Sequence, residues 1–242
     1  MIILSVGMPR AVSGWYYNLT NSIMLANGAQ DSRQIRQRYH LQSILTEVNC
    51  NIGTLTPKRI LPVLIPSLLG NTFVIKAHAA PTPMASFLIK NGWMKTTHIY
   101  RDPRDALLSA LENGERARAA KRRNAFSSLE NLDDGLSFML TYLDIWYKWM
   151  QRKKVLHVRY EDLLTSYDLE AKKLVDFLNI DQFDHHIQTE ISKFHPENTS
   201  TEQKGIHFSQ GKIGRYRRRM NQANQEKMNI SFMPYLKQMG YE

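Results

Sequence analysis

The segment Gly7–Trp15 contains two side chains that could bind an anion, Arg10 and Ser13. It follows the short apolar run 2–6 and precedes a stretch with helical composition. A short loop that enters a helix offers free backbone N–H groups and the positive end of the helix dipole to an anion. Arg10 would add a full positive charge and Ser13 a hydroxyl donor. The pattern is typical of a phosphate site, and an ordinary strand–helix turn is the alternative.

Lys76 and His78 stand at the end of a second apolar run, 72–76. Alternation along an extended chain places the two side chains on the same side. An imidazole with its ordinary pKa of about 6.5 can accept a proton near neutral pH. His78 is therefore a candidate general base, and a structural or surface histidine is the alternative.

Arg101 ends a third run, 96–100, and Ser109 lies about two turns into the helix that follows. Both side chains could reach one phosphate above the end of the strand. The alternative is that Arg101 pairs with a neighbouring carboxylate, Asp102 or Asp105.

Two further segments could contact a nucleotide. Tyr160 follows the run 155–159 and could stack on a base or fill the core. Gly211, Lys212 and Gly214 form a glycine-spaced basic loop, and glycine permits close approach of the backbone to an anion. The same loop could equally bind RNA or no ligand.

The elements that must position these residues alternate along the chain. Strands are expected at 2–6, 72–76, 96–100 and 155–159, and helices at 15–26, from 103 onward, at 131–150 and at 167–178. Asp102 can cap the helix that starts at Pro103, because aspartate is favoured at the N-cap and proline at the first helical position. Residues 29–70 are mostly helical or irregular. This alternation predicts an α/β fold with a central parallel sheet flanked by helices, in which ligands bind at the carboxyl ends of the strands.

Composition limits the class of protein. The chain has 242 residues, a formal charge of +10 and one cysteine, which excludes a disulfide scaffold. Its length and 43% hydrophobic content predict a single domain over residues 1–242 with a sizeable core. The sequence shows no apolar run of membrane-spanning length and no signal peptide, so we expect a cytoplasmic protein without a transmembrane segment. The basic clusters at 116–123 and 201–242 are either phosphate-attracting or solvated surface.

The order and spacing of these motifs resemble the sulfotransferases that use 3′-phosphoadenosine 5′-phosphosulfate (PAPS). The motifs run from Gly7 to Gly214, over nearly the whole chain. The resemblance implies a fold like that of the P-loop nucleotide-binding proteins. It also implies PAPS as the sulfuryl donor, adenosine 3′,5′-bisphosphate (PAP) as the product, and no metal. The acceptor would be a hydroxyl or amine of a small molecule or carbohydrate, and no nucleic-acid partner is expected.

The resemblance also implies a role for each residue. His78 would be the catalytic base, with Arg10 and Lys76 as catalytic cations. The remaining matches would hold the cofactor, and together with Arg10 they are Ser13, Gly14, Trp15, Arg101, Ser109, Tyr160, Gly211, Lys212 and Gly214. Trp15 would stack on the adenine, and Arg101 and Ser109 would bind the 3′-phosphate.

The chain departs from the family at three places. Ala11 and Val12 stand where the family's first loop has Ser-Gly, and Gly14 replaces a hydroxyl. Ser209-Gln210 precedes Gly211 where many relatives have Arg-Lys. Two readings on the same fold therefore remain open beside the sulfotransferase. One is a phosphoryl transferase, which would need the Walker lysine that this loop lacks. The other is a PAP-binding member of the family without activity.

Overall fold

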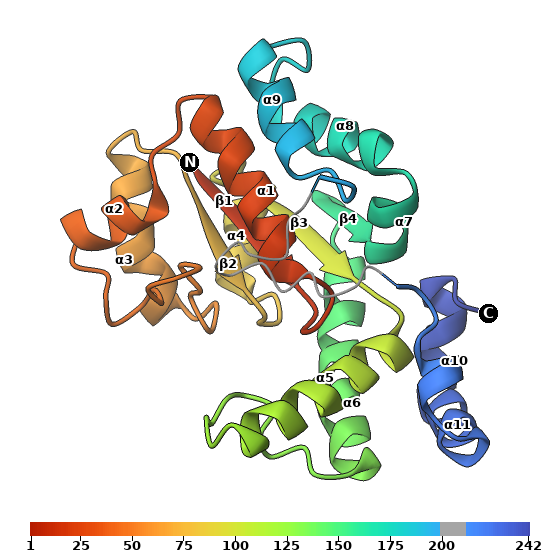
Figure 1. The fold of residues 1–242 in the computed structure, drawn as a ribbon. Coiled ribbons are helices and arrows are strands. Elements are labelled where there is room, and N and C mark those ends of the chain that lie inside the picture. The colour runs from red at the N-terminus through yellow and green to blue at the C-terminus, as the bar shows by residue number, and fades with distance from the viewer. Residues whose placement is uncertain (199–211) are drawn as a thin grey trace.

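The computed structural model describes residues 1–198 and 212–242 and has a four-stranded sheet at its centre (Figure 1). The strands are β1 (Ile2–Gly7), β2 (Phe73–Ala77), β3 (Met94–Tyr100) and β4 (Val155–Arg159). Their order is β2-β1-β3-β4, and each neighbouring pair is parallel. β1 lies between β2 and β3, so the chain leaves it toward one edge and later returns on its other side. Such a reversal of strand order is where ligands bind in open α/β sheets.

Helices connect the strands and follow the last of them. Those before β4 are α1 (Ser13–Ala26), α2 (Ser32–Arg38), α3 (Pro57–Leu68), α4 (Pro83–Lys90), α5 (Pro103–Ala119) and α6 (Leu132–Met150). Those after β4 are α7 (Tyr160–Thr165), α8 (Tyr167–Leu178), α9 (His185–Lys193), α10 (Tyr216–Arg219) and α11 (Gln222–Met239). Within the described residues, no helix is long and apolar enough to cross a membrane.

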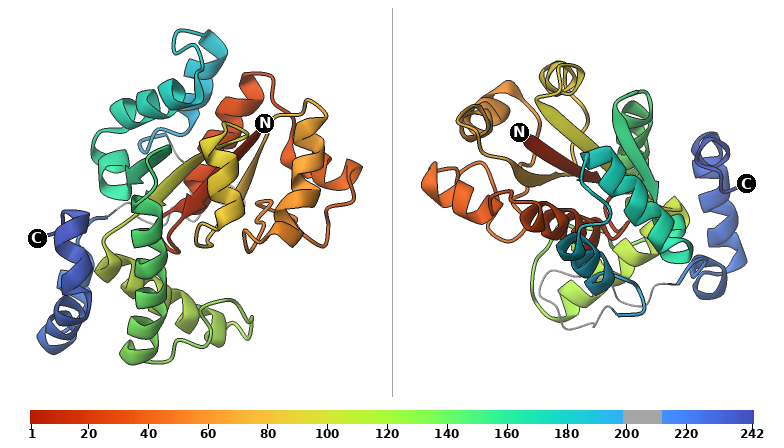
Figure 2. Two further views of the ribbon diagram at one scale, coloured as in Figure 1. Left: turned by 180° about the vertical axis from the view of Figure 1, so that it is seen from behind. Right: turned by 90° about the horizontal axis from the view of Figure 1, so that it is seen from above.

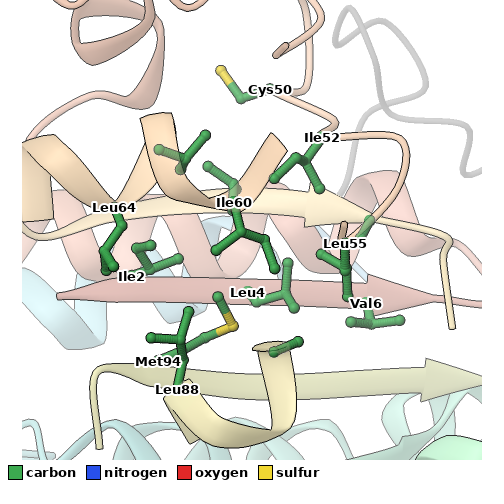
Figure 3. Close-up of a cluster of buried hydrophobic side chains, with 14 of the residues drawn as sticks. Ile2, Leu4, Val6, Cys50, Ile52, Leu55, Ile60, Leu64, Leu88 and Met94 are labelled. Atoms are coloured by element: carbon green, nitrogen blue, oxygen red, sulfur yellow. The ribbon is translucent and has the colours of Figure 1, made fainter. Parts of the chain in front are cut away.

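Helices cover both faces of the sheet (Figure 2). On one face, Ile2, Leu4 and Val6 of β1 lie under α3 and α4, because alternate side chains of a strand point the same way (Figure 3). The helices contribute Ile60, Leu64 and Leu88 to this cluster. Burying each such side chain stabilises the fold by roughly 1.5–3 kcal/mol.

The opposite face carries a second core. Ile3 of β1 and Ile99 of β3 pack there against α1, α8 and α9. α1 contributes Leu19 and Ile23, and α8 contributes Leu174. The near-continuous burial of β1 follows from this double cover and explains why its sequence is apolar at almost every position.

A third cluster lies beyond the carboxyl ends of the strands. It joins α5, α6 and α11 around Leu107, Leu143, Phe232 and Leu236 (Figure 1). The expected stripe of the long helix forms part of it, with Leu136, Met139, Leu143 and Trp146 buried. These three helices therefore stand over the edge of the sheet where ligands are expected.

The expected fold class is confirmed, and the elements fall close to their predicted bounds. The strand predicted at 155–159 matches β4, and the strand predicted at 72–76 lies one residue later. Asp102 caps α5 as expected, because its side chain accepts a hydrogen bond from the N–H of Arg104.

Candidate active site

A cavity of about 530 Å³ opens at the carboxyl ends of the strands. Each of the four strand ends contributes to it. The contributing residues are Pro9, Arg10, Val12, Ser13 and Gly14 after β1, Lys76 and His78 at the end of β2, Arg101 after β3, and Tyr160 after β4. Residues far apart in sequence thus meet where the sheet topology predicts a ligand site.

The loop between β1 and α1 is tight. A Cβ added at Gly7 would lie 2.3 Å from the Cβ of Ser13, so only glycine permits this close approach. Arg10 and Val12 have φ angles of 64° and 50°, in the region that favours glycine. Val12, at which the resemblance implies a glycine in the family, therefore has a glycine-like conformation. Strain of this kind persists where the surrounding structure holds it, as at ligand-binding loops.

The start of α1 faces the cavity. Ser13 and Gly14 line the cavity, and Val12 at the N-cap makes no side-chain capping bond. The first backbone N–H groups of a helix have no partner within the helix. These groups and the helix dipole make the turn at Ser13 suited to an anion.

Trp15 is not brought to this cavity. Its side chain is fully buried in the core between α1 and α8, and its ring centroid lies 5.9 Å from that of Tyr167. The helical turn that places Ser13 and Gly14 at the cavity directs the next side chain toward the sheet.

His78 and Lys76 lie together at the end of β2. His78 Nδ1 lies 2.6 Å from the carbonyl oxygen of Gly7. A carbonyl oxygen only accepts, so Nδ1 carries the proton and Nε2 keeps its lone pair. Burial, and then the charge of Lys76, lower the pKa of His78 to about 4, while the bond to Gly7 opposes this shift. The imidazole is therefore neutral at pH 7.

Lys76 is a buried cation. Its side chain lines the cavity, and burial lowers the pKa of its amine to about 8. The edge of β2 is covered at this residue. The N–H of Lys76 donates to the carbonyl of Cys50 at 3.2 Å, and its carbonyl accepts from the N–H of Ile52 at 2.9 Å.

Arg10 and Ser109 are brought together. Arg10 Nε donates to Ser109 Oγ at 3.0 Å, although the residues are 99 positions apart. Burial, and then the charges of Arg116 and Arg101, lower the pKa of Arg10 to about 10. Arg10 and Arg101 both line the cavity and their positive charges repel each other, so an anion bound there would relieve an unfavourable interaction.

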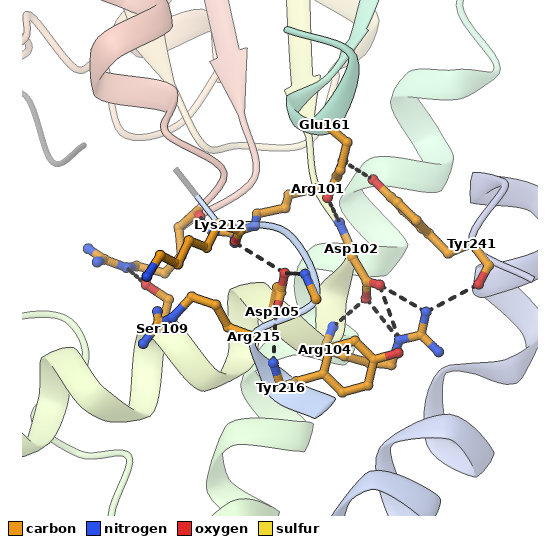
Figure 4. A network of polar contacts seen from close by, with 12 residues as sticks. Arg101, Asp102, Arg104, Asp105, Ser109, Glu161, Lys212, Arg215, Tyr216 and Tyr241 are labelled. Atoms are coloured by element: carbon orange, nitrogen blue, oxygen red, sulfur yellow. Dashed lines mark hydrogen bonds and ion pairs between the residues drawn. The ribbon is translucent and has the colours of Figure 1, made fainter. Parts of the chain in front are cut away.

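Arg101 lies deep in the cavity beside Tyr160. Its guanidinium carbon lies 4.3 Å from the centre of the Tyr160 ring. It donates to the carbonyl oxygen of Lys212 at 3.1 Å and to Asp105 Oδ2 at 3.2 Å (Figure 4). Its Nε is buried and has no hydrogen-bond partner within the described residues. Both expected alternatives for Arg101 thus apply, because it faces the cavity and also pairs with a carboxylate.

The C-terminal loop reaches the cavity through Lys212 and Arg215. Gly214, with φ of 72°, does not line the cavity, and its N–H donates to Asp105 at 2.7 Å. Gly211 lies outside the residues that the structure describes.

Sequence reasoning did not find the remaining walls. Asn49 and Asn51 flank Lys76 on one side, because the segment that carries them pairs with β2. The Oδ1 atom of Asn49 is buried without a partner in the described part of the chain. No motif marks these asparagines, since they come from the irregular part of 29–70.

An aromatic and amide wall closes the other side. It consists of Asn113, Asn124, Phe126, Phe138 and Tyr142. Phe138 lies between the other two aromatic rings, with centroids 5.7 Å from Phe126 and 4.9 Å from Tyr142. The helical spacing of Phe138 and Tyr142 on α6 would have indicated an aromatic face, but not that this face lines a cavity.

The charge of the cavity is one-sided. Five cationic residues line it, namely Arg10, Lys76, Arg101, Lys212 and Arg215, and no carboxylate does so within residues 1–198 and 212–242. In the same two ranges no group of three or more His, Cys, Asp or Glu side chains could hold a metal ion. The cavity is therefore built for a ligand with several negative charges.

The profile of the sulfotransferase domain matches residues 67–240. The chain belongs to the sulfotransferase family. The resemblance seen in the motifs is thereby confirmed, and the chain is assigned to a family of enzymes. The match begins after β1 and its loop. No curated protein matches the sequence.

Solved sulfotransferase structures share the fold. Mouse sulfotransferase SULT7A1, complexed with PAP, superposes with a TM-score of 0.61 at 14% identity, covering 98% of this chain and 84% of that one. Retinol dehydratase, in complex with androsterone and the inactive cofactor PAP, gives a TM-score of 0.62 at 18% identity, covering 98% and 80%.

Proposed function

We propose that this sulfotransferase transfers the sulfuryl group of PAPS to a hydroxyl or amine of a small-molecule or carbohydrate acceptor, with His78 as the general base. The main support is the combination in one cavity of five cations, no facing carboxylate in the described residues, and a histidine whose Nε2 can accept a proton. The two structural neighbours described above are complexes with PAP.

The cavity fits a donor with phosphates at both ends of a nucleoside. When bound, PAPS would supply the sulfuryl group, and its negative charges would neutralise these cations. Arg101 Nε is buried without a partner in the described residues and offers a donor to the 3′-phosphate. Ser109 lines the same cavity and accepts a hydrogen bond from Arg10. Ser13 and the N-terminus of α1 would hold the 5′-phosphate end.

His78 would take the acceptor's proton at Nε2. Gly7 fixes the ring through Nδ1, so the lone pair stays on the atom that faces substrate. The lowered pKa keeps the imidazole neutral and ready to accept, although it makes His78 a weaker base. Positioning against the acceptor would therefore provide much of its effect.

Lys76 and Arg10 would neutralise the negative charge that grows on the phosphate as the sulfuryl group departs. Both groups are buried or partly buried, so their electrostatic interactions are stronger than they would be in water. We expect this protein stabilisation to replace a metal, so that the activity survives in EDTA.

The acceptor would contact the parts of the cavity wall that the donor does not occupy. Asn49 and Asn51 offer hydrogen bonds near Lys76, and Phe126, Phe138 and Tyr142 offer apolar faces. Hydroxyl-bearing molecules with an apolar face would fit both kinds of wall.

A thermal-shift titration tests the donor assignment. PAP should raise the melting temperature far more than adenosine 5′-monophosphate (AMP), which lacks only the 3′-phosphate. At a hundredfold excess over Kd, a ligand bound by the native state alone adds about 2.7 kcal/mol of stability. A larger shift with ATP and magnesium than with PAP would favour the phosphoryl transferase.

Turnover then separates an active enzyme from a PAP-binding relative. PAP release from PAPS should depend on an added acceptor, drawn from a panel of phenols, alcohols, amines and sugars. PAP binding without turnover on any acceptor of the panel would favour the inactive member of the family. Salt-sensitive binding of oligonucleotides in place of PAP would favour the nucleic-acid alternative for the basic loop.

A further inference from the structure

Asp105 has no role in the proposed chemistry, yet among the described residues it is the most deeply buried charged group near the cavity. It lies in the first turn of α5, and its side chain is 0% exposed. A buried carboxylate is unfavourable unless it is paired and hydrogen-bonded. The hydrogen-bond partners of Asp105 therefore indicate which parts of the chain it positions.

Three donors converge on this carboxylate (Figure 4). Oδ2 accepts from Arg101 NH2 at 3.2 Å and from the backbone N–H of Gly214 at 2.7 Å. Oδ1 accepts from the backbone N–H of Tyr216 at 3.0 Å. One side chain thus joins the end of β3, the first turn of α5 and the loop before α10.

Two further contacts hold the loop before α10 to Arg101 and to α5. Arg101 NH2 donates to the carbonyl oxygen of Lys212, and Arg215 NH2 pairs with Glu112 at 2.7 Å. Lys212 and Arg215 both line the cavity, so the position of this loop sets where two of its cations lie.

The arrangement also fixes Arg101. NH2 of its guanidinium is occupied by Asp105 and Lys212, while Nε stays without a partner in the described residues. The planar guanidinium presents its donors in a fixed fork, so holding one nitrogen orients the others.

We propose that Asp105 is a positioning residue that aims Arg101 and holds the segment 212–216 over the 3′-phosphate end of the donor. The assignment rests on the proposed function. Asp105 does not contact the ligand. It acts through Arg101 and through the two backbone N–H groups that it accepts.

The test compares the affinities for PAP and AMP by calorimetry in Asp105→Asn and wild type. Asparagine keeps the size of the side chain but removes its charge. Its NH2 group is a donor, so it cannot accept the hydrogen bonds that one of the two carboxylate oxygens accepts. We expect the ratio of PAP to AMP affinity to fall at least about tenfold, with AMP affinity nearly unchanged. A fall of equal factor for both ligands would indicate general damage to the fold and would overturn the assignment.

Asp102→Asn is the matched control. Asp102 is also buried and ion-paired, but its partner Arg104 bonds to Asn229 of α11 and to the carbonyl oxygen of Tyr241, and it contacts Tyr216 through the ring and not through the backbone N–H (Figure 4). Asparagine caps helices as well as aspartate does, so α5 should keep its start. This variant should retain the wild-type ratio, and an equal loss in both variants would contradict a specific role for Asp105.

Two further variants keep the test decisive if Asp105→Asn does not fold. Asp105→Glu retains the charge beside Arg101 but displaces it, and should also lower the ratio. In an Arg101→Ala background, changing Asp105 should lower the ratio by a smaller factor than it does in the wild type, because only its bonds to Gly214 and Tyr216 remain to be lost. Equal affinity of the wild type for PAP and AMP would overturn the proposed function and this assignment together. Discrimination by the wild type that persists in both Asp105 variants would overturn the assignment alone.

Discussion

The carbonyl oxygen of Gly7 lies 2.6 Å from His78 Nδ1, so the last residue of one strand fixes the tautomer of a histidine that follows its neighbour. β1 and β2 are adjacent and in parallel register, with Val6 opposite Ala77. The pairing of the two strands therefore brings the ring of this cavity-lining histidine to a backbone carbonyl, which leaves the lone pair on Nε2.

His78→Ala should lower kcat by at least tenfold, because a positioned general base contributes about 10²–10⁴ in rate. PAP affinity should stay near the wild-type value, since the proposed phosphate contacts are made elsewhere. Steady-state kinetics and PAP titration check the two parts. His186→Ala, an exposed histidine far from the cavity, is the control. Wild-type kcat in His78→Ala would remove the histidine from the mechanism.

The activity should depend on pH through two groups, because His78 must be neutral and Lys76 must be charged. His78, with its pKa lowered to about 4, becomes protonated and inactive only below that pH. Lys76, with its pKa lowered to about 8, loses its charge as the pH rises through that value. The rate should therefore be nearly constant between these limits and decline outside them. In Lys76→Arg the alkaline decline should shift upward, because arginine stays charged. An alkaline limb that is unchanged in this variant would exclude Lys76 as its source.

Gly114→Ala should raise the KM for the acceptor while leaving PAP affinity unchanged. A Cβ at Gly114 would lie 2.2 Å from the backbone oxygen of Phe126, so the segment that carries the aromatic wall must move away from α5. Gly135→Ala is the matched control, because its Cβ would meet only side-chain atoms of Leu107 and Leu111 at 3.3 Å or more. Equal effects of the two substitutions on acceptor KM would show that the wall does not contact the acceptor.

The folded state should lose stability as the pH falls below about 6.5. His98 and His157 are opposite each other in β3 and β4, with ring centroids 5.6 Å apart. Burial, and then the charge of His157, keep the pKa of His98 well below its ordinary value, and burial also lowers the pKa of His157. The unfolded chain therefore binds protons at these histidines that the folded chain does not bind. The free energy of unfolding should fall by up to about 1.4 kcal/mol per unit decrease in pH for each histidine that stays neutral in the folded state.

Urea unfolding at pH 8, 6.5 and 5 checks this prediction. His98→Leu should reduce the acid sensitivity, because it removes the more deeply buried of the two histidines. A stability curve as steep in this variant as in the wild type would assign the effect to other residues.

The strands and the residues that follow them could be predicted because both are local signals. The predicted strand 155–159 coincides with β4, and the fixed geometry of a helix predicts that Arg101 and Ser109 lie near one ligand site, which both of them line. Trp15 was expected at the adenine but lies in the core, since its direction depends on how α1 packs on the sheet.

The rest of the site depends on contacts distant in sequence. Asn51 reaches the cavity only because its segment pairs with β2, and Asp105 meets Gly214 across 109 positions. Neither contact leaves a periodic pattern or a motif. The alternative expected for Arg101, pairing with Asp105, also proved compatible with facing the cavity, because a guanidinium has donors for both.

The backbone bonds that Lys76 makes with Cys50 and Ile52 have a consequence for self-association. β2 is an outer strand, and an outer strand with unsatisfied amides and carbonyls is a template for aggregation. At Lys76 both backbone groups are already occupied by the protein's own chain. The end of β2 that borders the cavity is thereby protected from pairing with a strand of a second molecule. The cavity can be open to solvent there without exposing unpaired backbone groups at Lys76.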